Sequence, residues 1–262
     1  MTAPVLRTAR LVSAYRRYLI TADAPRFAAE VGQYYSTATL LRVLSDGGVE
    51  LRRAAALAMG VLGDVEAIEP LGRRLADEDR GVRLAADDSF RGLMIREGAA
   101  AQQHRLLRVM HLNDGGEFAA ALAPALILTD HAPDYAEAHH QLAICWLGLG
   151  DFAAAEQALR CCLWYRRFHY AAWVGLAHCR LQGEDPDADD LRMGLTALRR
   201  AIAICPDLEA PRLELRRLER AIEEQQPGGD CLPYRPGFFD EVDPLGPSRG
   251  DDFFDGFEPE DD

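Results

Sequence analysis

Residues 116–121 of this chain read Gly-Glu-Phe-Ala-Ala-Ala, and residues 150–155 read Gly-Asp-Phe-Ala-Ala-Ala. The two stretches lie 34 residues apart, and the same shift carries Leu142-Ala143 onto Leu176-Ala177. A period of about 34 residues is typical of a helical pair stacked on a copy of itself. Such stacks bury their cores between neighbouring units and leave a long open surface. The pattern therefore predicts a helical repeat protein with a surface suited to binding.

A second repeat lies upstream, with a period of 31 residues. Residues 51–55 read Leu-Arg-Arg-Ala-Ala, residues 82–86 read Val-Arg-Leu-Ala-Ala, and Asp46 and Asp77 precede these helices at the same spacing. This upstream repeat segment, residues 37–98, resembles HEAT repeats of the short, bacterial, phycobilisome-lyase-like kind. The resemblance implies helical pairs in which an arginine braces the aspartate-rich turn before its helix.

The second upstream unit departs from the first at two places. Asp87-Asp88 stands where the first unit has Ala56-Leu57, and Arg91-Gly92 stands where it has Gly60-Val61. Two explanations stay open at this point. The helix is either a polar, terminal one, or it forms an unusual junction with the next part of the chain.

The downstream repeat segment, residues 99–226, resembles tetratricopeptide (TPR) repeats. The small-residue signature is Leu142, Ala143, Gly150, Ala155 and Leu159 in one unit, and Leu176, Ala177, Leu198, Ala201 and Pro206 in the next. Arg167 replaces a usual proline, and the insertion at residues 183–190 predicts a long acidic loop. The final helix, about 208–225, is highly charged and suits a solvated cap.

The TPR resemblance implies that the first helix of each unit lines a concave face. By the period, the inward positions are Leu106, Met110, His140, Ile144, Val174, His178, Leu213 and Arg217. An apolar stripe rimmed by polar groups usually marks a binding site, so we expect a peptide or protein segment to bind there. The chain has no Lys and one Asn, so it cannot build the Lys/Asn carboxylate clamp of co-chaperone TPR domains.

The charge is concentrated at the C-terminal end. Residues 227–262, the acidic tail, hold 11 acidic residues and 2 arginines, a net charge of −9 out of −13. The rest is nearly balanced, which argues against nucleic-acid binding. The composition predicts a disordered tail, yet its aromatic pairs are unusual for one. The duplicated motif is Phe238, Phe239 and Asp240, then Phe253, Phe254 and Asp255.

The tail motif has three interpretations. It docks in a partner, folds back onto the chain's own groove near His140, His178 and Arg217, or belongs to a tail that only solubilises. Two copies on one tail would raise the effective concentration of the motif.

Catalytic and metal-binding patterns are weak. The serines sit in no nucleophile elbow, and no glycine-rich phosphate loop follows a strand. His139 and His140 point about 100° apart on a helix, so they do not chelate well with His178. The acidic runs 77–79 and 87–88 are interpreted as a solvated turn and face. The cysteines form no C-x-x-C pair and are expected to be buried, reduced thiols. No catalytic residue, metal or cofactor is therefore expected.

The sequence thus predicts an all-α protein, a right-handed α-solenoid of antiparallel helix pairs, HEAT-like then TPR-like, with a disordered acidic C-terminal tail. The expected parts are N-terminal helices at 1–36, repeats at 37–98 and 99–226, and the tail at 227–262. The expected function is a non-catalytic, cytoplasmic scaffold for an unidentified protein or peptide, without membrane insertion or a signal peptide. The alternatives are an enzyme accessory or lyase-like HEAT protein, and a structural subunit.

Overall fold

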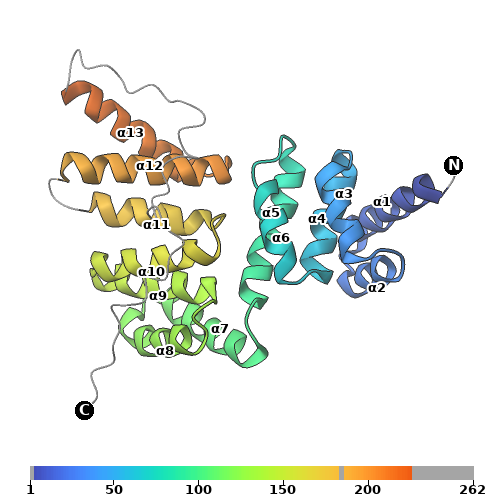
Figure 1. The fold of residues 1–262 in the computed structure, drawn as a ribbon, viewed down its shortest axis with the longest axis horizontal. Helices are drawn as coiled ribbons and strands as arrows, with labels where there is room; N and C mark the ends of the chain where they lie inside the picture. The colour runs from blue at the N-terminus through green and yellow to red at the C-terminus, as the bar shows by residue number, and fades with distance from the viewer. Residues whose placement is uncertain (1–2, 183–185, 226–262) are drawn as a thin grey trace. The chain divides into compact units, whose positions relative to one another are not determined.

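The computed structural model describes the backbone of residues 3–182 and 186–225, and the side chains of residues 9–182 and 186–222. The chain divides into two units, Met1–Glu219 and Arg220–Asp262, and nearly all described residues belong to the first. Every regular element in the described part is helical (Figure 1). The helices are α1 Ala3–Thr21, α2 Ala24–Tyr34, α3 Thr37–Asp46, α4 Val49–Leu62, α5 Ile68–Arg74, α6 Arg80–Arg96, α7 Ala100–Asp114, α8 Phe118–His131, α9 Ala136–Leu149, α10 Phe152–Tyr165, α11 Tyr170–Leu181, α12 Ala188–Ile204 and α13 Glu209–Gln225, and a 3₁₀ turn, Val65–Ala67, precedes α5.

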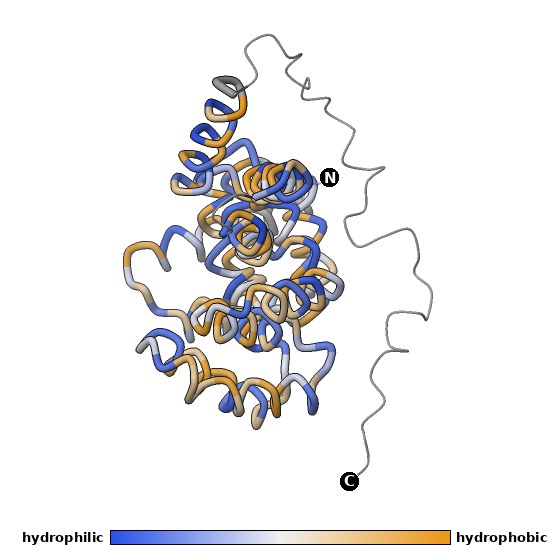
Figure 2. Tube along the Cα trace, turned by 90° about the vertical axis from the view of Figure 1, so that its left-hand side faces the viewer, coloured by the Kyte–Doolittle hydropathy of each residue, from blue (hydrophilic) through white to orange (hydrophobic). Residues whose placement is uncertain are grey.

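Consecutive helices pack in pairs, and each pair packs on the next. Helix α3 contacts α4, α5 contacts α6, and α4 contacts α6; downstream, each helix from α7 to α12 contacts its neighbour in the chain. The predicted all-α solenoid is confirmed. One continuous apolar core runs from Leu11 in α1 to Ile204 in α12. Figure 2 shows apolar and polar residues alternating along the helices.

Each copy of the repeated stretch, residues 116–121 and 150–155, contains a turn from one helix to the next. Gly116 and Gly150 follow α7 and α9 with φ of +73° and +81°, in the left-handed region that glycine adopts without steric cost. Gly150 donates its N–H to the carbonyl oxygens at the end of α9, which a left-handed cap allows. Each glycine therefore ends one helix so that the next can fold back on it.

The small residues of the repeat let these helices approach closely. Ala121 and Ala155, the last residues of the repeated stretches, are fully buried. A Cβ built on Gly148 would lie 2.2 Å from the ring of Phe118, so the aromatic side chain packs directly on the backbone of α9. Close packing of this kind explains the fixed positions of alanine and glycine in the repeat.

The acidic insertion before α12 is shorter than the sequence suggested. Helix α12 begins at Ala188, so the last three residues of the expected loop are helical. Asp187 caps the helix by accepting a hydrogen bond from the backbone N–H of Asp190 at 2.8 Å. Asp189 and Asp190 occupy the first turn, where the helix dipole favours acidic side chains. Local helix-start chemistry thus outweighed the loop composition.

Candidate functional site

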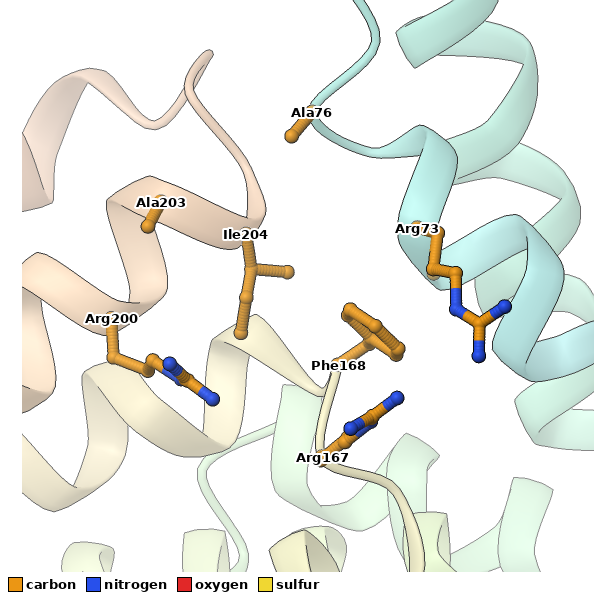
Figure 3. A pocket seen from close by; sticks show the side chains of 8 residues that line it. Arg73, Ala76, Arg167, Phe168, Arg200, Ala203 and Ile204 are labelled. Carbon is orange, nitrogen blue, oxygen red and sulfur yellow. The ribbon is translucent and has the colours of Figure 1, made fainter. Parts of the chain in front are cut away.

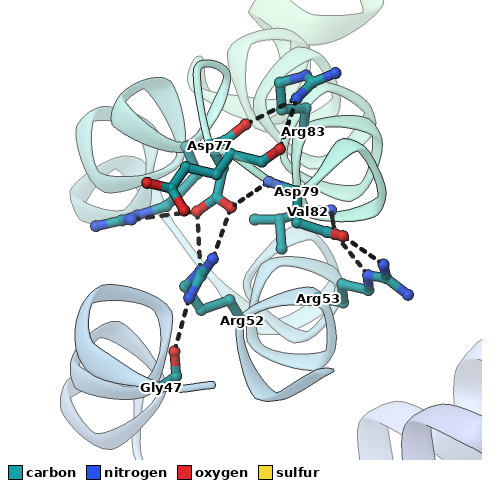
Figure 4. A network of polar contacts seen from close by, with 9 residues as sticks. Gly47, Arg52, Arg53, Asp77, Asp79, Val82 and Arg83 are labelled. Atoms are coloured by element: carbon teal, nitrogen blue, oxygen red, sulfur yellow. Dashed lines mark hydrogen bonds and ion pairs between the residues drawn. The ribbon is translucent and has the colours of Figure 1, made fainter. Parts of the chain in front are cut away.

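Arginine forks tie successive turns of the upstream segment together (Figure 4). Arg52 donates from Nε and Nη2 to the two carboxylate oxygens of Asp77, at 2.9 and 2.8 Å, and from Nη1 to the carbonyl oxygen of Gly47 at 3.0 Å. The arginine thus braces the turn before its helix, as the resemblance implied, and also the following turn. Asp77 was expected in a solvated turn, but it is buried and held by Arg52 and Arg74. That expectation was wrong for Asp77, because the guanidinium groups of Arg52 and Arg74 bind its carboxylate and cover it.

The neighbouring arginine, Arg53, binds the other aspartate of this turn, Asp79. Arg53 donates to both carboxylate oxygens of Asp79, at 2.7 and 2.6 Å. Asp79 also caps α6 by accepting from the backbone N–H of Val82 at 2.9 Å. The Arg53 hydrogen bond is the main reason that the pKa of Asp79 falls to about 2.

The same fork joins the upstream segment to the downstream one. Arg83 donates from Nε and Nη2 to the two carboxylate oxygens of Asp207, both at 2.8 Å. Its Nη1 donates to the carbonyl oxygens of Asp77 and Glu78, at 2.9 and 3.2 Å. The hydrogen bond from Arg83 lowers the pKa of Asp207. Asp207, near the end of the downstream segment, therefore binds Arg83 in the way that Asp77 binds Arg52.

Two arginines before α11 reinforce this junction. Arg167 donates to Glu69 at 2.6 Å, and Arg166 pairs with Glu97. Arg167 is the residue that replaces the usual proline of the TPR pattern. Its departure from that pattern thus coincides with an ion pair between the two segments.

The polar substitutions in α6 lie at the same junction. Asp87 accepts a hydrogen bond from the hydroxyl of Tyr170 at 2.7 Å. Burial, reinforced by this carboxylate, raises the pKa of Tyr170. Arg91 lies 3.8 Å from Asp87 on the same helix. Of the two explanations left open by the sequence, these contacts favour the unusual junction.

A pocket of about 250 Å³ opens at this junction (Figure 3). Phe168 projects between Arg73 and Ile204, and its ring packs against Gly72, where an added Cβ would lie 2.6 Å from the side chain. We call it the junction pocket. Its lining residues are Gly72, Arg73, Ala76, Arg167, Phe168, Arg200, Ala203 and Ile204.

The junction pocket carries an excess of positive charge. Arg73 and Arg167 share a single carboxylate, that of Glu69, at 2.7 and 2.6 Å. The Arg200 guanidinium carbon lies 6.0 Å from the centre of the Trp173 ring, and among the described residues no carboxylate pairs with it. Three guanidinium groups thus face one carboxylate, around an apolar floor.

A buried polar cluster lies elsewhere, between α9 and the start of α11. Glu137 accepts hydrogen bonds from His140 Nδ1 at 3.1 Å, Gln141 Nε2 at 2.9 Å and His169 Nε2 at 3.1 Å. Burial raises the pKa of Glu137, but the charge and hydrogen bonds of the histidines outweigh it and hold that pKa well below its usual range. Burial lowers the pKa of His169. The cluster thus holds a buried carboxylate as an anion.

Glu137, His140 and His169 are also the one set in the described residues with metal-ligand spacing, because their ligand atoms lie within 4.8 Å of one another. However, Nδ1 of His169 accepts the backbone N–H of Ala172 at 3.1 Å, which caps α11. The ring proton must then be on Nε2, where it is donated to Glu137 rather than leaving a lone pair for a metal. The donor set fits a hydrogen-bond network better than a metal site.

The sequence pattern pointed to other histidines. His139 Nε2 donates to the Pro133 carbonyl oxygen at 2.7 Å and its ring stacks on Tyr165, while His178 contacts Gln182 at 3.0 Å. Neither joins the cluster. The signal that could have found the cluster is a Glu three residues before His140, with a second histidine one repeat later.

The groove positions expected from the period fall into three groups. Leu106 is fully buried with Leu128 and Tyr135, so it is a core residue and offers no surface. Met110, His140, Ile144 and Val174 are partly buried. His178, Leu213 and Arg217 are exposed. The tail motif, Phe238 to Asp240 and Phe253 to Asp255, lies outside the described residues.

The described cysteines are free thiols. Cys145, Cys162 and Cys205 are buried, whereas Cys161 and Cys179 are only partly buried. Burial raises the pKa of Cys179 to about 11 and holds the pKa of Cys162 well above its usual value. Such thiols are poor nucleophiles near neutral pH, because the thiolate is the reactive form.

Comparison with known protein families gives a match to part of the chain. The model described as HEAT repeats matches residues 14–91, from within α1 to within α6. This stretch is similar to HEAT repeats, as its arginine and alanine pattern predicted, and the match starts upstream of residue 37. The comparison with curated proteins finds no match. None of the helices in the described part combines the length and apolar content that a bilayer crossing requires.

Proposed function

We propose that this chain is a non-catalytic scaffold that binds a peptide or protein segment along the first helices of the downstream repeats. The observation that carries the proposal is the placement of His140 and Ile144 on α9 and of Val174 and His178 on α11. Helices α9 and α11 contact each other, and none of these four side chains is fully buried. Each pair is spaced by four residues, so its members share one face of their helix.

The similarity of residues 14–91 to HEAT repeats supports a role in protein interaction, since helical repeats expose long surfaces rather than closed catalytic pockets. The surface proposed for binding excludes Leu106 and consists of Met110, His140, Ile144, Val174, His178, Leu213 and Arg217. Tail motifs that occupy this surface in the absence of a partner would make the scaffold self-regulated.

The proposal is tested by site-specific photocrosslinking of the full chain in its native cells. A photoreactive residue at position 178 is expected to capture a defined partner. The same residue at the exposed position Gln157 on α10 serves as the control. His178→Glu should reduce the amount of that partner that copurifies, and Gln157→Glu should not. Identical capture at both positions would contradict binding through the first helices.

A further inference from the structure

The junction pocket has the chemistry of a site for an acidic, aromatic ligand. Its three arginines meet a single carboxylate, that of Glu69, which Arg73 and Arg167 share, so the group has an excess of two positive charges and Arg200 has no carboxylate partner in the described residues. An anion that enters the pocket would gain hydrogen bonds from guanidinium groups, which bind carboxylates as a fork. Phe168 and Ile204 offer an apolar wall beside these donors.

The volume limits the ligand. At about 250 Å³ the pocket lies below the roughly 300–1,000 Å³ of sites for drug-sized molecules. It suits one or two side chains of a peptide rather than a cofactor. An aromatic ring fits the site by stacking on Phe168 or on a guanidinium face, because both contacts are favourable in offset or planar arrangements.

This chain carries a segment with that chemistry twice. We propose that a Phe-Phe-Asp motif of the chain's own acidic tail, at residues 238–240 or 253–255, binds in the junction pocket. A phenylalanine ring would pack on Phe168 and Ile204, and the motif's aspartate would pair with Arg200. The tail's net charge of −9 complements the excess positive charge of the pocket. This inference goes beyond the proposed function, because the pocket contains none of the groove residues.

The covalent chain is long enough for this contact. Helix α13 starts five residues after Ile204 and, with 17 residues, is about 26 Å long. The 12 residues between Gln225 and Phe238 span up to roughly 40 Å when extended. The first motif can therefore return to the level of Ile204, and the second copy would raise the local concentration of the motif.

The groove is the poorer host for the same motif. His140 is engaged with Glu137 and is only 15% exposed at its side chain. His178 contacts Gln182 and the ring of Phe152. Near these positions the groove offers titratable rings that are already in contact with neighbours, whereas Arg200 in the pocket has no carboxylate among the described residues.

The test compares two full-length proteins by methyl NMR with labelled isoleucine. The wild-type chain is compared with a variant that replaces Phe238, Phe239, Phe253 and Phe254 by alanine. The four positions lie outside the residues that the structure describes, so the substitutions remove none of the described packing contacts. Ile204 reports on the junction pocket and Ile144 on the groove. We expect the Ile204 methyl resonance to shift between the two proteins and the Ile144 resonance to stay.

Three results would overturn the proposal. If Ile204 has the same shift in both proteins, the pocket does not hold the motif. A change at Ile144 alone would place the motif in the groove and favour self-regulation of the proposed function. If the Ile204 difference fades on tenfold dilution, the motif comes from a second copy. If the Ile204 difference persists on dilution and is lost near 1 M salt, where the Debye length is about 3 Å, the result supports a contact within one chain.

A charge reversal provides the second measurement. In Arg200→Glu, the amide resonances of Phe239 and Phe254 should move to their positions in a synthetic peptide of residues 236–258. Arg192→Glu on the same helix is the matched control, because Arg192 is exposed and, within the part of the chain that the structure describes, its ion pair is with Asp189 alone. Tail resonances that respond equally to both variants would show a general charge effect and contradict binding in the pocket.

Discussion

Arg83 and Asp207 are 124 residues apart, yet they form the fork that Arg52 and Asp77 form between successive upstream turns. In both pairs, Nε and Nη2 of the arginine bind the two carboxylate oxygens at 2.8–2.9 Å. In both, Nη1 holds a backbone carbonyl of the preceding turn. The end of the downstream repeats therefore docks onto α6 as a further repeat would. The upstream and downstream segments are thus joined by the same kind of contact that Arg52 and Asp77 form within the upstream segment.

The two forks should differ in their contribution to stability. Asp77 has a side chain that is 2% exposed, against 36% for Asp207. Arg52→Ala removes the bidentate partner of a buried carboxylate and leaves it with the longer ion pair to Arg74, at 3.3 Å, so it should lower the free energy of unfolding by about 3 kcal/mol. Arg83→Ala should cost only about 1 kcal/mol, because water can solvate Asp207. Urea unfolding followed by circular dichroism measures both, and equal costs would contradict the burial argument.

A matched control for this comparison is Arg192→Ala. Arg192 pairs with Asp189 on the surface, and both side chains are more than two-thirds exposed. Its removal should change the free energy of unfolding by no more than about 0.5 kcal/mol.

Two glycine-to-alanine substitutions distinguish the effect of packing at the junction from the effect of helix propensity. Gly72→Ala would bring a methyl group to 2.6 Å from Phe168, so it should destabilise the protein by about 1–3 kcal/mol. At Gly92 in α6, an added Cβ meets nothing within 4 Å. Gly92→Ala should therefore raise stability by roughly 0.5–1 kcal/mol, the gain expected from helix propensity. Thermal unfolding distinguishes them, and a neutral Gly72→Ala would mean that Phe168 can move aside.

The buried cluster predicts that stability falls in mild acid. The pKa of His169 is lowered in the folded state, so its contribution is fully present above the unfolded value of about 6.5 and is lost progressively as pH falls below it. The lowered pKa of Glu137 adds a second loss below its unfolded value of about 4.3. Unfolding free energies at pH 7, 6 and 5 should therefore decrease.

His169→Asn isolates this effect. Asparagine keeps a cap for α11 but has no titrating ring. The variant should be less stable at pH 7, because Glu137 loses a donor, and its stability should change less between pH 7 and 5. Part of the pH dependence of stability should remain in this variant, because burial also lowers the pKa of His139. An unchanged slope would remove His169 from the acid response.

Metal addition tests the hydrogen-bond assignment of the same cluster. Since the Nε2 proton of His169 is donated to Glu137, excess Zn²⁺ or EDTA should leave the Tm unchanged. A ligand that binds the folded state would raise the Tm by mass action, because it adds about 2.7 kcal/mol to the free energy of unfolding at a hundredfold excess over Kd. A rise that His140→Ala abolishes would show that the ring is turned and the cluster binds metal.

Much of the helical architecture could be read from the chain. The upstream repeat predicted helices that contain residues 51–55 and 82–86, and these are observed as Val49–Leu62 and Arg80–Arg96. These succeed because Asp79 and the glycines act within a few residues of the helix ends. The site was harder to predict: Leu106 has the spacing of a groove residue, but Tyr135 and Leu128 cover it. A period gives the face of a helix, not the neighbour that lies on it.

Local signals in the sequence are sufficient to predict the helices and the turns between them, because caps, glycines and apolar spacing act over a single turn or a single repeat. The charges that meet across the junction follow from tertiary packing. Arg83 finds Asp207, Arg167 finds Glu69, and Arg200 is left without a carboxylate in the described residues. Such pairs depend on how two helical stacks pack, and residues this far apart in the chain carry no local signal of it.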